Sequence, residues 1–372
     1  MMDTKILCFY LPQFHATEDN NKWWGEGYTD WEASKAAKKY FRRHKQPRYP
    51  LNNRYYDLSD ETAEALKWQA QLASQYGIYG FCIYHYWFGG KRELEKPVEI
   101  LREHQEINIR YSLCWDSGTW RRTWYADQYE QEVLIEQVYG NKDVWKKHFN
   151  DLLADFKDPR YIKIGNKPVF HIYRAYQVEC LVEMKEYWNT LARQNGFDGI
   201  YLVAGDLEHR ESKKLFNAVD AFYNFEPNRA FYAGRKSVYV KYTVARAGIV
   251  KRINRRFGKE YLPDIRDAKG IYDLIERYDM SPKKKTYLGL FPDYDDTPRR
   301  QLKGTVYINN RVEYFERCLK AQLEKSDKLG NEFLYINAWN EWGESAYLEP
   351  DKDNGYLYLE TVKKVIKEME NT

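Results

Sequence analysis

Eight short apolar runs recur along this chain, and longer amphipathic stretches separate them. The runs cover 5–11, 80–87, 110–115, 168–173, 200–204, 218–225, 286–291 and 333–339. Continuous apolar strands that alternate with helices are typical of a parallel sheet covered by helices. Eight such units ending in a helix predict an α/β fold, a (β/α)8 TIM barrel. A doubly wound open sheet is the alternative, but no glycine-rich nucleotide turn follows any run.

Apolar residues at helical spacing mark four of the connecting helices. Ser59 and Asp60 are expected to open the first helix and Gly77 to stop it. The stripes are Leu66, Ala70 and Ala73; Leu181, Met184, Trp188 and Leu191; Val312, Phe315, Leu319 and Leu323; and Leu359, Val362 and Ile366. We expect one catalytic domain over 1–372, with a long loop after the first strand.

A basic segment follows the sixth predicted strand. Residues 228–266 hold 11 Lys/Arg and 2 Asp/Glu, a local charge of +9, whereas the whole chain has a net charge of +4. The whole-chain balance gives no indication of nucleic acid as a partner. The segment is either a solvated, partly mobile insertion or a basic surface for an anionic partner, such as a phosphate-bearing glycolipid or a membrane.

Cysteine usage and the N-terminal sequence bear on the compartment. The five cysteines show no CxxC spacing, and the first ten residues lack the apolar region and cleavage site of a signal peptide. No apolar stretch reaches the length of a membrane span. We therefore expect reduced thiols and a cytoplasmic location. The basic segment is a candidate for peripheral attachment at the inner membrane face.

Polar and aromatic residues follow most of the predicted strands. Active sites of TIM barrels lie at the carboxyl ends of the strands, and aromatic planes pack on the C–H faces of sugars. Aromatic residues make up 17% of the chain. The candidate substrate-binding residues are Tyr10, Gln13, His15, Trp24, Tyr28, Trp31, Tyr84, His85, Tyr86, Trp87, Trp115, Asp116, His171, Tyr173, Asn224, Asp295, Trp339, Asn340 and Trp342. For the tryptophans of the first loop and for the three histidines, structural packing is an equal alternative.

Glu341 and Glu344 are the candidate catalytic pair. They follow the eighth predicted strand, among tryptophan and asparagine side chains. Two carboxyl groups that share acid and base roles at a glycosidic bond lie about 5 to 9.5 Å apart, and a spacing of three residues favours the shorter separation. One of two such close carboxyls should have a raised pKa and supply the acid. The alternative is a solvated pair at the start of the last helix.

Sequence motifs for metal, nucleotide or cofactor binding are missing or weak in this chain. The chain has no HExxH, P-loop, GxGxxG or GxSxG pattern. Asp293 and Asp295 match the Asp-x-Asp pattern of metal-dependent glycosyltransferases, but no nucleotide-binding half precedes them, and Asp295 is equally a candidate acceptor for sugar hydroxyls. The sequence thus predicts no metal site and no cofactor.

Several segments together resemble the WbsX-like family of bacterial surface-polysaccharide gene clusters, which is similar to family 99 glycoside hydrolases, the endo-α-mannosidases and endo-α-mannanases. They are Tyr10-Leu-Pro-Gln-Phe-His15, Trp23-Trp-Gly-Glu-Gly-Tyr-Thr-Asp-Trp31, Tyr55-Tyr-Asp57, Tyr79 to Phe88, Asp295-Asp-Thr-Pro-Arg299 and Asn340-Glu-Trp-Gly-Glu344 with Glu349-Pro350. The resemblance implies a (β/α)8 barrel, no cofactor and retention of configuration. It implies that Glu341 deprotonates the sugar 2-hydroxyl to form a 1,2-anhydro sugar, and that Glu344 protonates the leaving oxygen. A glycosyl-enzyme ester on Glu341 is the rival mechanism.

One departure from the family pattern affects substrate identity. Where the family often shows Trp-Ala-Asn-Glu-Asn-Trp, this chain has Trp115-Asp-Ser-Gly-Thr-Trp120. The sugar and linkage are therefore not transferred. Three functions follow: cleavage or transfer at an internal glycosidic bond of a bacterial polysaccharide or oligosaccharide; glycosyl transfer from an activated donor in O-antigen or capsule synthesis; and a non-catalytic carbohydrate-binding barrel.

Overall fold

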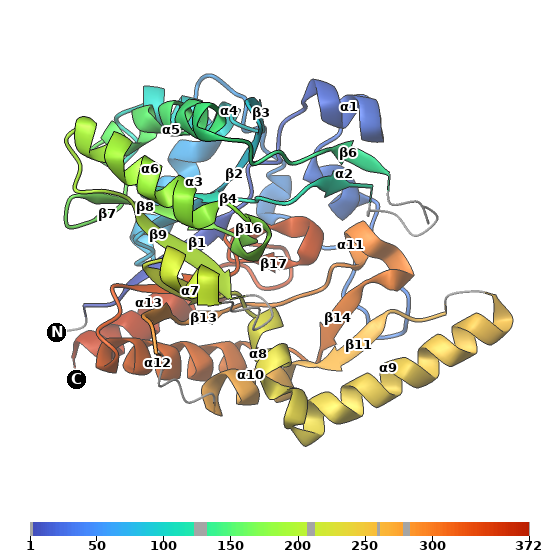
Figure 1. The fold of residues 1–372 in the computed structure, drawn as a ribbon. Helices are drawn as coiled ribbons and strands as arrows, with labels where there is room; N and C mark the ends of the chain where they lie inside the picture. The colour runs from blue at the N-terminus through green and yellow to red at the C-terminus, as the bar shows by residue number, and fades with distance from the viewer. Residues whose placement is uncertain (1–2, 123–131, 207–212, 259–260, 278–282, 372) are drawn as a thin grey trace.

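A parallel barrel forms the centre of the molecule (Figure 1). The computed structural model describes residues 3–122, 132–206, 213–258, 261–277 and 283–371. The barrel strands are β1 (Lys5–Tyr10), β2 (Gly80–Phe88), β4 (Arg110–Trp115), β8 (Lys167–Ile172), β9 (Tyr201–Asp206), β10 (Ala221–Asn224), β12 (Thr286–Tyr287), β13 (Gly289–Leu290) and β15 (Phe333–Ile336). Each predicted run overlaps one of these strands, except the seventh, which contains both β12 and β13.

Strand pairing closes the barrel. The order is β12-β10-β9-β8-β4-β2-β1-β15-β13, and all of these pairings are parallel. β12 and β13 are two halves of one strand, interrupted at Leu288; Thr286 pairs with Phe222 of β10, and Gly289 pairs with Tyr335 of β15. The (β/α)8 barrel prediction is therefore confirmed. Inside it, the Phe9 ring lies 5.1 Å from that of Tyr223 and 5.6 Å from that of Tyr335, so the interior is packed.

The predicted helical stripes all lie on helices of the outer layer. These helices are α3 (Glu64–Gln75), α4 (Lys96–Glu103), α5 (Lys142–Lys157), α6 (Leu181–Gln194), α7 (Lys213–Ala218), α10 (Ala268–Arg277), α12 (Val312–Lys328) and α13 (Leu357–Glu370). The predicted first helix start was wrong. Asp57 and Asp60 instead accept the backbone N–H groups of Ser59 and Thr62 in turns, and α3 begins only at Glu64.

Short helices and strands lie in the loops at the rim and on the outside of the barrel. The long loop after β1 contains α1 (Glu18–Trp24), α2 (Asp30–Lys35) and the 3-10 turn η1 (Leu51–Asn53). Other loops contain β3 (Lys91–Glu93), β5 (Trp120–Arg121), β6 (Val133–Ile135), β7 (Lys163–Ile164), η2 (Ala175–Gln177), α11 (Thr297–Arg300) and η4 (Gln301–Lys303). After β15 come β16 (Asn340–Glu341), η5 (Trp342–Glu344) and β17 (Ala346–Tyr347).

The basic segment is largely ordered secondary structure. It contains α8 (Asn228–Ala233), η3 (Gly234–Lys236), α9 (Val238–Phe257) and most of β11 (Asp264–Asp267), which pairs with β14 (Thr305–Ile308). The Arg266 guanidinium lies 3.9 Å from the centre of the Phe231 ring and so ties β11 to α8. α9 runs along the periphery of the molecule (Figure 1). Across the residues described, no helix has both the length and the hydropathy to cross a bilayer.

Candidate active site

A cavity of about 370 Å³ opens at the carboxyl ends of the barrel strands. Strands β2 and β5 and the segments after β1, β4, β8, β10, β13 and β15 contribute to its wall. The lining residues are Leu11, Gln13, Trp24, Tyr84, Tyr86, Asp116, Thr119, Trp120, Arg121, Leu134, Tyr173, Arg174, Phe225, Asn228, Tyr294, Arg299, Arg300, Glu341 and Glu344. Aromatic planes and charged groups thus converge on a space large enough for sugar rings.

Glu341 and Glu344 meet at one arginine. Arg299 Nη2 donates to Glu341 Oε2 at 2.9 Å, and Arg299 Nη1 donates to Glu344 Oε1 at 2.8 Å. Both carboxyl groups bind the same planar guanidinium and line the same cavity. Glu341 is buried, whereas the Glu344 side chain is 24% exposed. The cavity therefore presents one enclosed and one more accessible carboxyl group.

Asp30 is the third carboxyl group that binds Arg299. Arg299 Nε donates to Asp30 Oδ1 at 2.9 Å, and the Gly343 backbone N–H donates to Asp30 Oδ2 at 2.9 Å. A side chain at Gly343 does not fit, because a Cβ there would lie 2.5 Å from Arg299 Nε. The loop after β1 thus holds both the arginine and the turn between the two glutamates.

The protonation of Glu341 is shifted. Burial, the largest influence, raises the pKa of Glu341 to about 8; the charges of Glu344 and Asp30 add to this rise, and Arg299 opposes it. The predicted rise of one carboxyl pKa therefore falls on Glu341. This is the residue to which the resemblance gives the role of base, whereas the sequence argument expected the raised pKa on the acid.

Glu349 supports the tryptophans around Glu341 and Glu344. It accepts hydrogen bonds from Trp339 Nε1 at 3.0 Å and Trp342 Nε1 at 2.7 Å, and from Gln69 at 2.7 Å. Burial raises the pKa of Glu349 to about 7, and the donors oppose the rise. Asn340 pairs with the backbone of Leu11, accepting at 2.8 Å and donating at 3.0 Å. Trp339, Asn340 and Trp342 therefore orient the turn and do not line the cavity.

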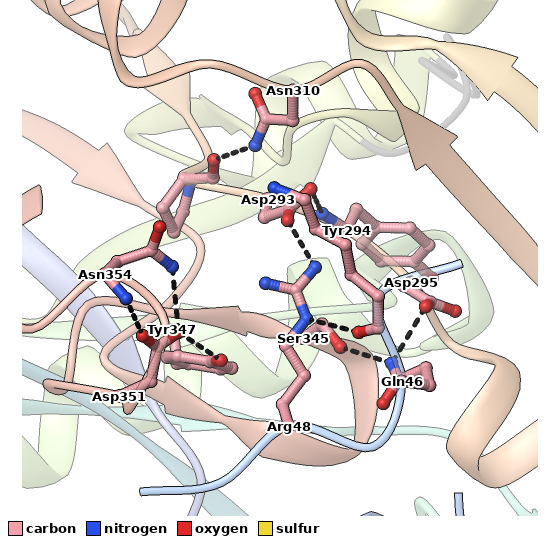
Figure 2. A network of polar contacts seen from close by, with 12 residues as sticks. Gln46, Arg48, Asp293, Tyr294, Asp295, Asn310, Ser345, Tyr347, Asp351 and Asn354 are labelled. Carbon is pink, nitrogen blue, oxygen red and sulfur yellow. Dashed lines mark hydrogen bonds and ion pairs between the residues drawn. The ribbon is translucent and has the colours of Figure 1, made fainter. Parts of the chain in front are cut away.

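Asp293 and Asp295 belong to a polar network behind the cavity (Figure 2). Arg48 donates to Asp293 at 2.6 Å, and Gln46 donates to Asp295 at 2.8 Å. Although burial acts to raise it, the hydrogen bond and charge of His44 hold the pKa of Asp295 below its usual value. The Asp295 backbone N–H also donates to the Glu344 carbonyl at 2.8 Å. Asp295 thus holds the Glu344 loop in place and does not line the cavity. The predicted role of Asp295 as an acceptor for sugar hydroxyls therefore has no support.

The segment after β4 brings Asp116 beside Arg174. Arg174 Nε lies 3.6 Å from Asp116 Oδ1, an oxygen without a hydrogen-bond partner among the described residues. Burial raises the pKa of Asp116, and Arg174 opposes the rise. A Cβ at Gly118 would lie 2.6 Å from Arg174 Nη1. Glycine at this position therefore leaves room for the arginine on the cavity wall, where the resembled family carries a larger side chain.

Strand alternation decides which predicted aromatic residues reach the cavity. Successive side chains of a barrel strand point inward and outward in turn. On β2, Tyr84 and Tyr86 line the cavity, whereas Trp87 stacks on His148 of α5 with ring centres 4.1 Å apart. Of the predicted substrate-binding residues, those that line the cavity are Gln13, Trp24, Tyr84, Tyr86, Asp116 and Tyr173.

The other predicted residues contact protein groups instead. Trp115 Nε1 donates to the Trp87 carbonyl at 3.1 Å, Tyr10 donates to Gln69 at 2.7 Å, and Trp31 Nε1 donates to the Tyr56 carbonyl at 2.9 Å. Tyr28 packs its ring 6.0 Å from that of Trp24, and Asn224 is buried at the end of β10. Trp31 also packs against Trp342, so Trp31 has a packing role. Trp24 lines the cavity, with the Arg122 guanidinium 4.9 Å from its ring centre.

The three candidate histidines are all packed in the protein. His15 Nδ1 lies 3.0 Å from the Pro12 carbonyl, and His171 Nε2 lies 2.7 Å from Tyr335 Oη inside the barrel. His85 faces outward, with its Nε2 2.9 Å from that of His148, and burial together with Arg92 lowers the pKa of His85 to about 3. None of the three lines the cavity. Their positions at the ends of three predicted strands therefore did not make them cavity residues.

Several cavity residues received no role from the sequence. Arg299 lies in a segment that carries the family resemblance, and Trp120 ends the motif that departs from it, but no pattern assigned either a function. Trp120 packs its ring 4.9 Å from that of Tyr86. Asp30 was likewise overlooked. Within the described ranges, no group of three or more His, Cys, Asp or Glu side chains is arranged to hold a metal ion.

Comparison with protein families and sequences identifies relatives that match most of this chain. Residues 6–362 match the family described as Glycosyltransferase WbsX. The uncharacterized protein WxcX of Xanthomonas campestris pv. campestris ATCC 33913 is 30% identical over 369 residues, which are 97% of this chain and 49% of that protein. WxcX of strain B100 matches to the same extent. The chain therefore spans about half the length of these curated relatives.

Solved structures with the same fold include glycoside hydrolases. The GH99 endo-alpha-mannosidase from Bacteroides thetaiotaomicron superposes with a TM-score of 0.56 and 14% identity, covering 100% of this chain and 99% of that one. A glycoside hydrolase-like protein superposes with a TM-score of 0.59 and 11% identity, covering 98% and 94% of the two chains. At these identities the likeness concerns the fold.

Proposed function

The chain belongs to the WbsX glycosyltransferase family, and we propose that it is a retaining carbohydrate-active enzyme of the family 99 type. It cleaves or transfers at an internal glycosidic bond, as an endo-α-mannosidase does, of a bacterial polysaccharide or oligosaccharide. The single observation that carries this proposal is the pair Glu341 and Glu344, both bound to Arg299 at the edge of an aromatic cavity. Retaining enzymes require two carboxyl groups held close together on one bond.

We propose separate roles for the two carboxyl groups. Glu341 acts as the base that takes the proton of the sugar 2-hydroxyl while this oxygen attacks C1 and the glycosidic bond breaks. Glu344, which is more accessible, gives its proton to the leaving oxygen and then takes one from the water or acceptor hydroxyl that opens the 1,2-anhydro sugar, while Glu341 returns its proton to the sugar 2-oxygen. A glycosyl ester on Glu341 is the competing route to retention. The proposed sugar contacts are Gln13, Trp24, Tyr84, Tyr86, Asp116 and Tyr173.

The proposal is tested with an oligosaccharide panel. Wild-type protein is incubated with α- and β-linked bacterial and mannose-containing oligosaccharides, and products are separated and assigned an anomeric configuration by NMR. We expect cleavage or transfer of at least one internal linkage with retention. Inversion would contradict the proposed chemistry. Binding of glycans without turnover by the wild type would favour a non-catalytic carbohydrate-binding barrel.

The pH profile of kcat/KM separates the proposed roles. The pKa of Glu341 is raised to about 8, and a base must be ionised in the free enzyme to react. A substrate with an acidic phenol as leaving group isolates the base, because this oxygen departs without a proton. With Glu341 as the base, kcat/KM on this substrate should rise about tenfold per pH unit below this value and level off above it. With Glu341 as the acid, kcat/KM on this substrate should instead show no step at pH 8. The measurement is kcat/KM on the phenol-bearing substrate from pH 5 to pH 10.

Glycosyl transfer from an activated donor is the second candidate. The family description favours it, and so do Arg121, Arg174 and Arg300 on the cavity wall, because arginine forks bind phosphate oxygens well. Calorimetry with nucleotide sugars, with and without Mn²⁺, provides the test. Binding that depends on the nucleotide diphosphate and on the metal would support a donor site. If the panel shows turnover and no nucleotide sugar binds, cleavage or transfer between glycans is the function.

The compartment is part of the proposal. The five cysteines are free, and Cys8, Cys82, Cys114 and Cys318 are buried. Free thiols support a reducing environment, so we propose that the enzyme acts in the cytoplasm on glycan intermediates of surface-polysaccharide synthesis. Such intermediates in O-antigen or lipopolysaccharide assembly carry anionic lipid anchors. We propose that the basic segment binds these anchors at the inner membrane face.

A further inference from the structure

Helix α9 carries a surface that the proposed chemistry does not use. Its 20 residues include six Lys/Arg and no Asp or Glu. The cations are Lys241, Arg246, Lys251, Arg252, Arg255 and Arg256. Within the described part of the chain, none of the six is paired with a carboxylate. The helix therefore presents six uncompensated positive charges to its surroundings.

The same helix exposes large apolar side chains. Val238, Tyr242, Ile249, Ile253 and Phe257 are between 45% and 84% exposed. At the spacing of an α-helix these five positions fall within an arc of about 100°, so they form one continuous stripe. Isolated exposed apolar residues are normal on a protein surface, but a stripe five residues long is not. We call this stripe and its cations the α9 surface.

One flank of α9, next to the apolar stripe, attaches it to the protein. Val240, Thr243 and Asn254 are buried, and Tyr239 donates to the Asp267 carbonyl of β11 at 2.8 Å. Arg246 and Arg256 lie within the apolar arc, and Lys241 and Arg252 border it on the helical projection. The α9 surface is thus a fixed amphipathic face of apolar and cationic side chains.

We propose that the α9 surface binds an anionic lipid bilayer, with the helix lying in the interface. A helix with basic and apolar residues together on its outer side places the apolar side chains among the acyl chains and the cations among the lipid phosphates. A nucleic acid would use the charges but would leave Val238, Ile249 and Ile253 in water, so the aliphatic part of the stripe favours the bilayer. Asn228, where the same insertion begins, lines the cavity, so the insertion contributes both to the cavity wall and to the α9 surface.

Vesicle flotation with the full chain tests the proposal. Wild-type protein should float with vesicles of phosphatidylglycerol and phosphatidylcholine, and it should remain behind with phosphatidylcholine alone. Binding should weaken as salt is added, because salt screens the interfacial charges. The variant Arg252→Glu/Arg256→Glu should partition at least about 30-fold less, since each basic residue near an anionic surface contributes a several-fold gain.

Two further variants separate insertion from charge attraction. Ile249→Ser/Phe257→Ser keeps all six cations and should lower partitioning at least about tenfold, because two apolar side chains no longer leave water. The control Lys146→Glu/Arg193→Glu makes the same charge change on the exposed surfaces of α5 and α6 and should float like the wild type. These sites are distant from the catalytic pair in sequence and exposed, so turnover of a soluble glycan should be unchanged in all three variants.

Three outcomes would overturn membrane docking. One is equal flotation with neutral and anionic vesicles; another is an Ile249→Ser/Phe257→Ser protein that floats like the wild type. The third is preference for duplex DNA over vesicles in competition, which would assign the surface to nucleic acid. Because turnover of a soluble glycan is measured separately, failure of docking and failure of the proposed chemistry give different results.

Discussion

Glu344→Gln is expected to lower kcat/KM on a natural oligosaccharide about 10²- to 10⁴-fold, because the amide cannot give a proton to the leaving oxygen. The fold should remain, since the Glu344 side chain is partly exposed and its one described partner is the Arg299 side chain. The loss should shrink on a substrate with an acidic phenol as leaving group, because such an oxygen departs without protonation. Initial rates on both substrates provide the measurement.

Two companion variants make this result specific. Glu341→Gln should be inactive on both substrates, because the base is needed whichever group leaves. Glu313→Gln changes an exposed carboxylate on α12 and should behave like the wild type. Activity of Glu344→Gln within a few-fold of wild type on the natural substrate would remove the assignment of this residue as the acid. Rescue of Glu341→Gln by the activated substrate would exchange the two roles.

The barrel could be predicted because its signals are local. Each strand is a short apolar run, each helix carries its own stripe, and the count of eight restricts the topology. The glutamate pair was found for the same reason, since both residues lie in one turn. The start of α3 was missed because Asp60 and Thr62 form a turn that resembles a helix cap in sequence.

The rest of the site depends on contacts between distant segments. Arg299 and Asp30 are 269 residues apart, yet they form one bond beside the glutamates. Nothing in either neighbourhood indicates the other. The outward histidine His85 illustrates the same limit: its contact with His148 is set by strand alternation and by the packing of α5. Too many aromatic residues at strand ends were therefore predicted to line the cavity. Successive side chains of a strand alternate, so about half of them point outward to the helices.

Replacing Arg299 by methionine should be the most destabilising single change at the site. Its side chain and that of Asp30 are 7% and 0% exposed, and it also binds Glu341. Removing one partner of a buried ion pair costs on the order of 3 to 5 kcal/mol, because the remaining charge is left buried without compensation. Urea denaturation at neutral pH measures the difference. Arg300→Met removes a half-exposed cation of the same helix, which pairs with one carboxylate, Asp296, and should cost less than Arg299→Met.

The dependence of this loss on pH identifies its cause. Without Arg299, the pKa of Glu341 in the folded state should rise further above its wild-type value of about 8. The wild type releases this proton above pH 8 whereas the variant keeps it, so the two proteins differ in bound protons only in that range. The deficit of Arg299→Met should therefore grow as pH rises through 8. Adding Asp30→Asn should restore part of the stability at neutral pH, because the uncompensated charge is gone. A deficit that is constant with pH, and not relieved by Asp30→Asn, would mean that Arg299 stabilises the loop through packing.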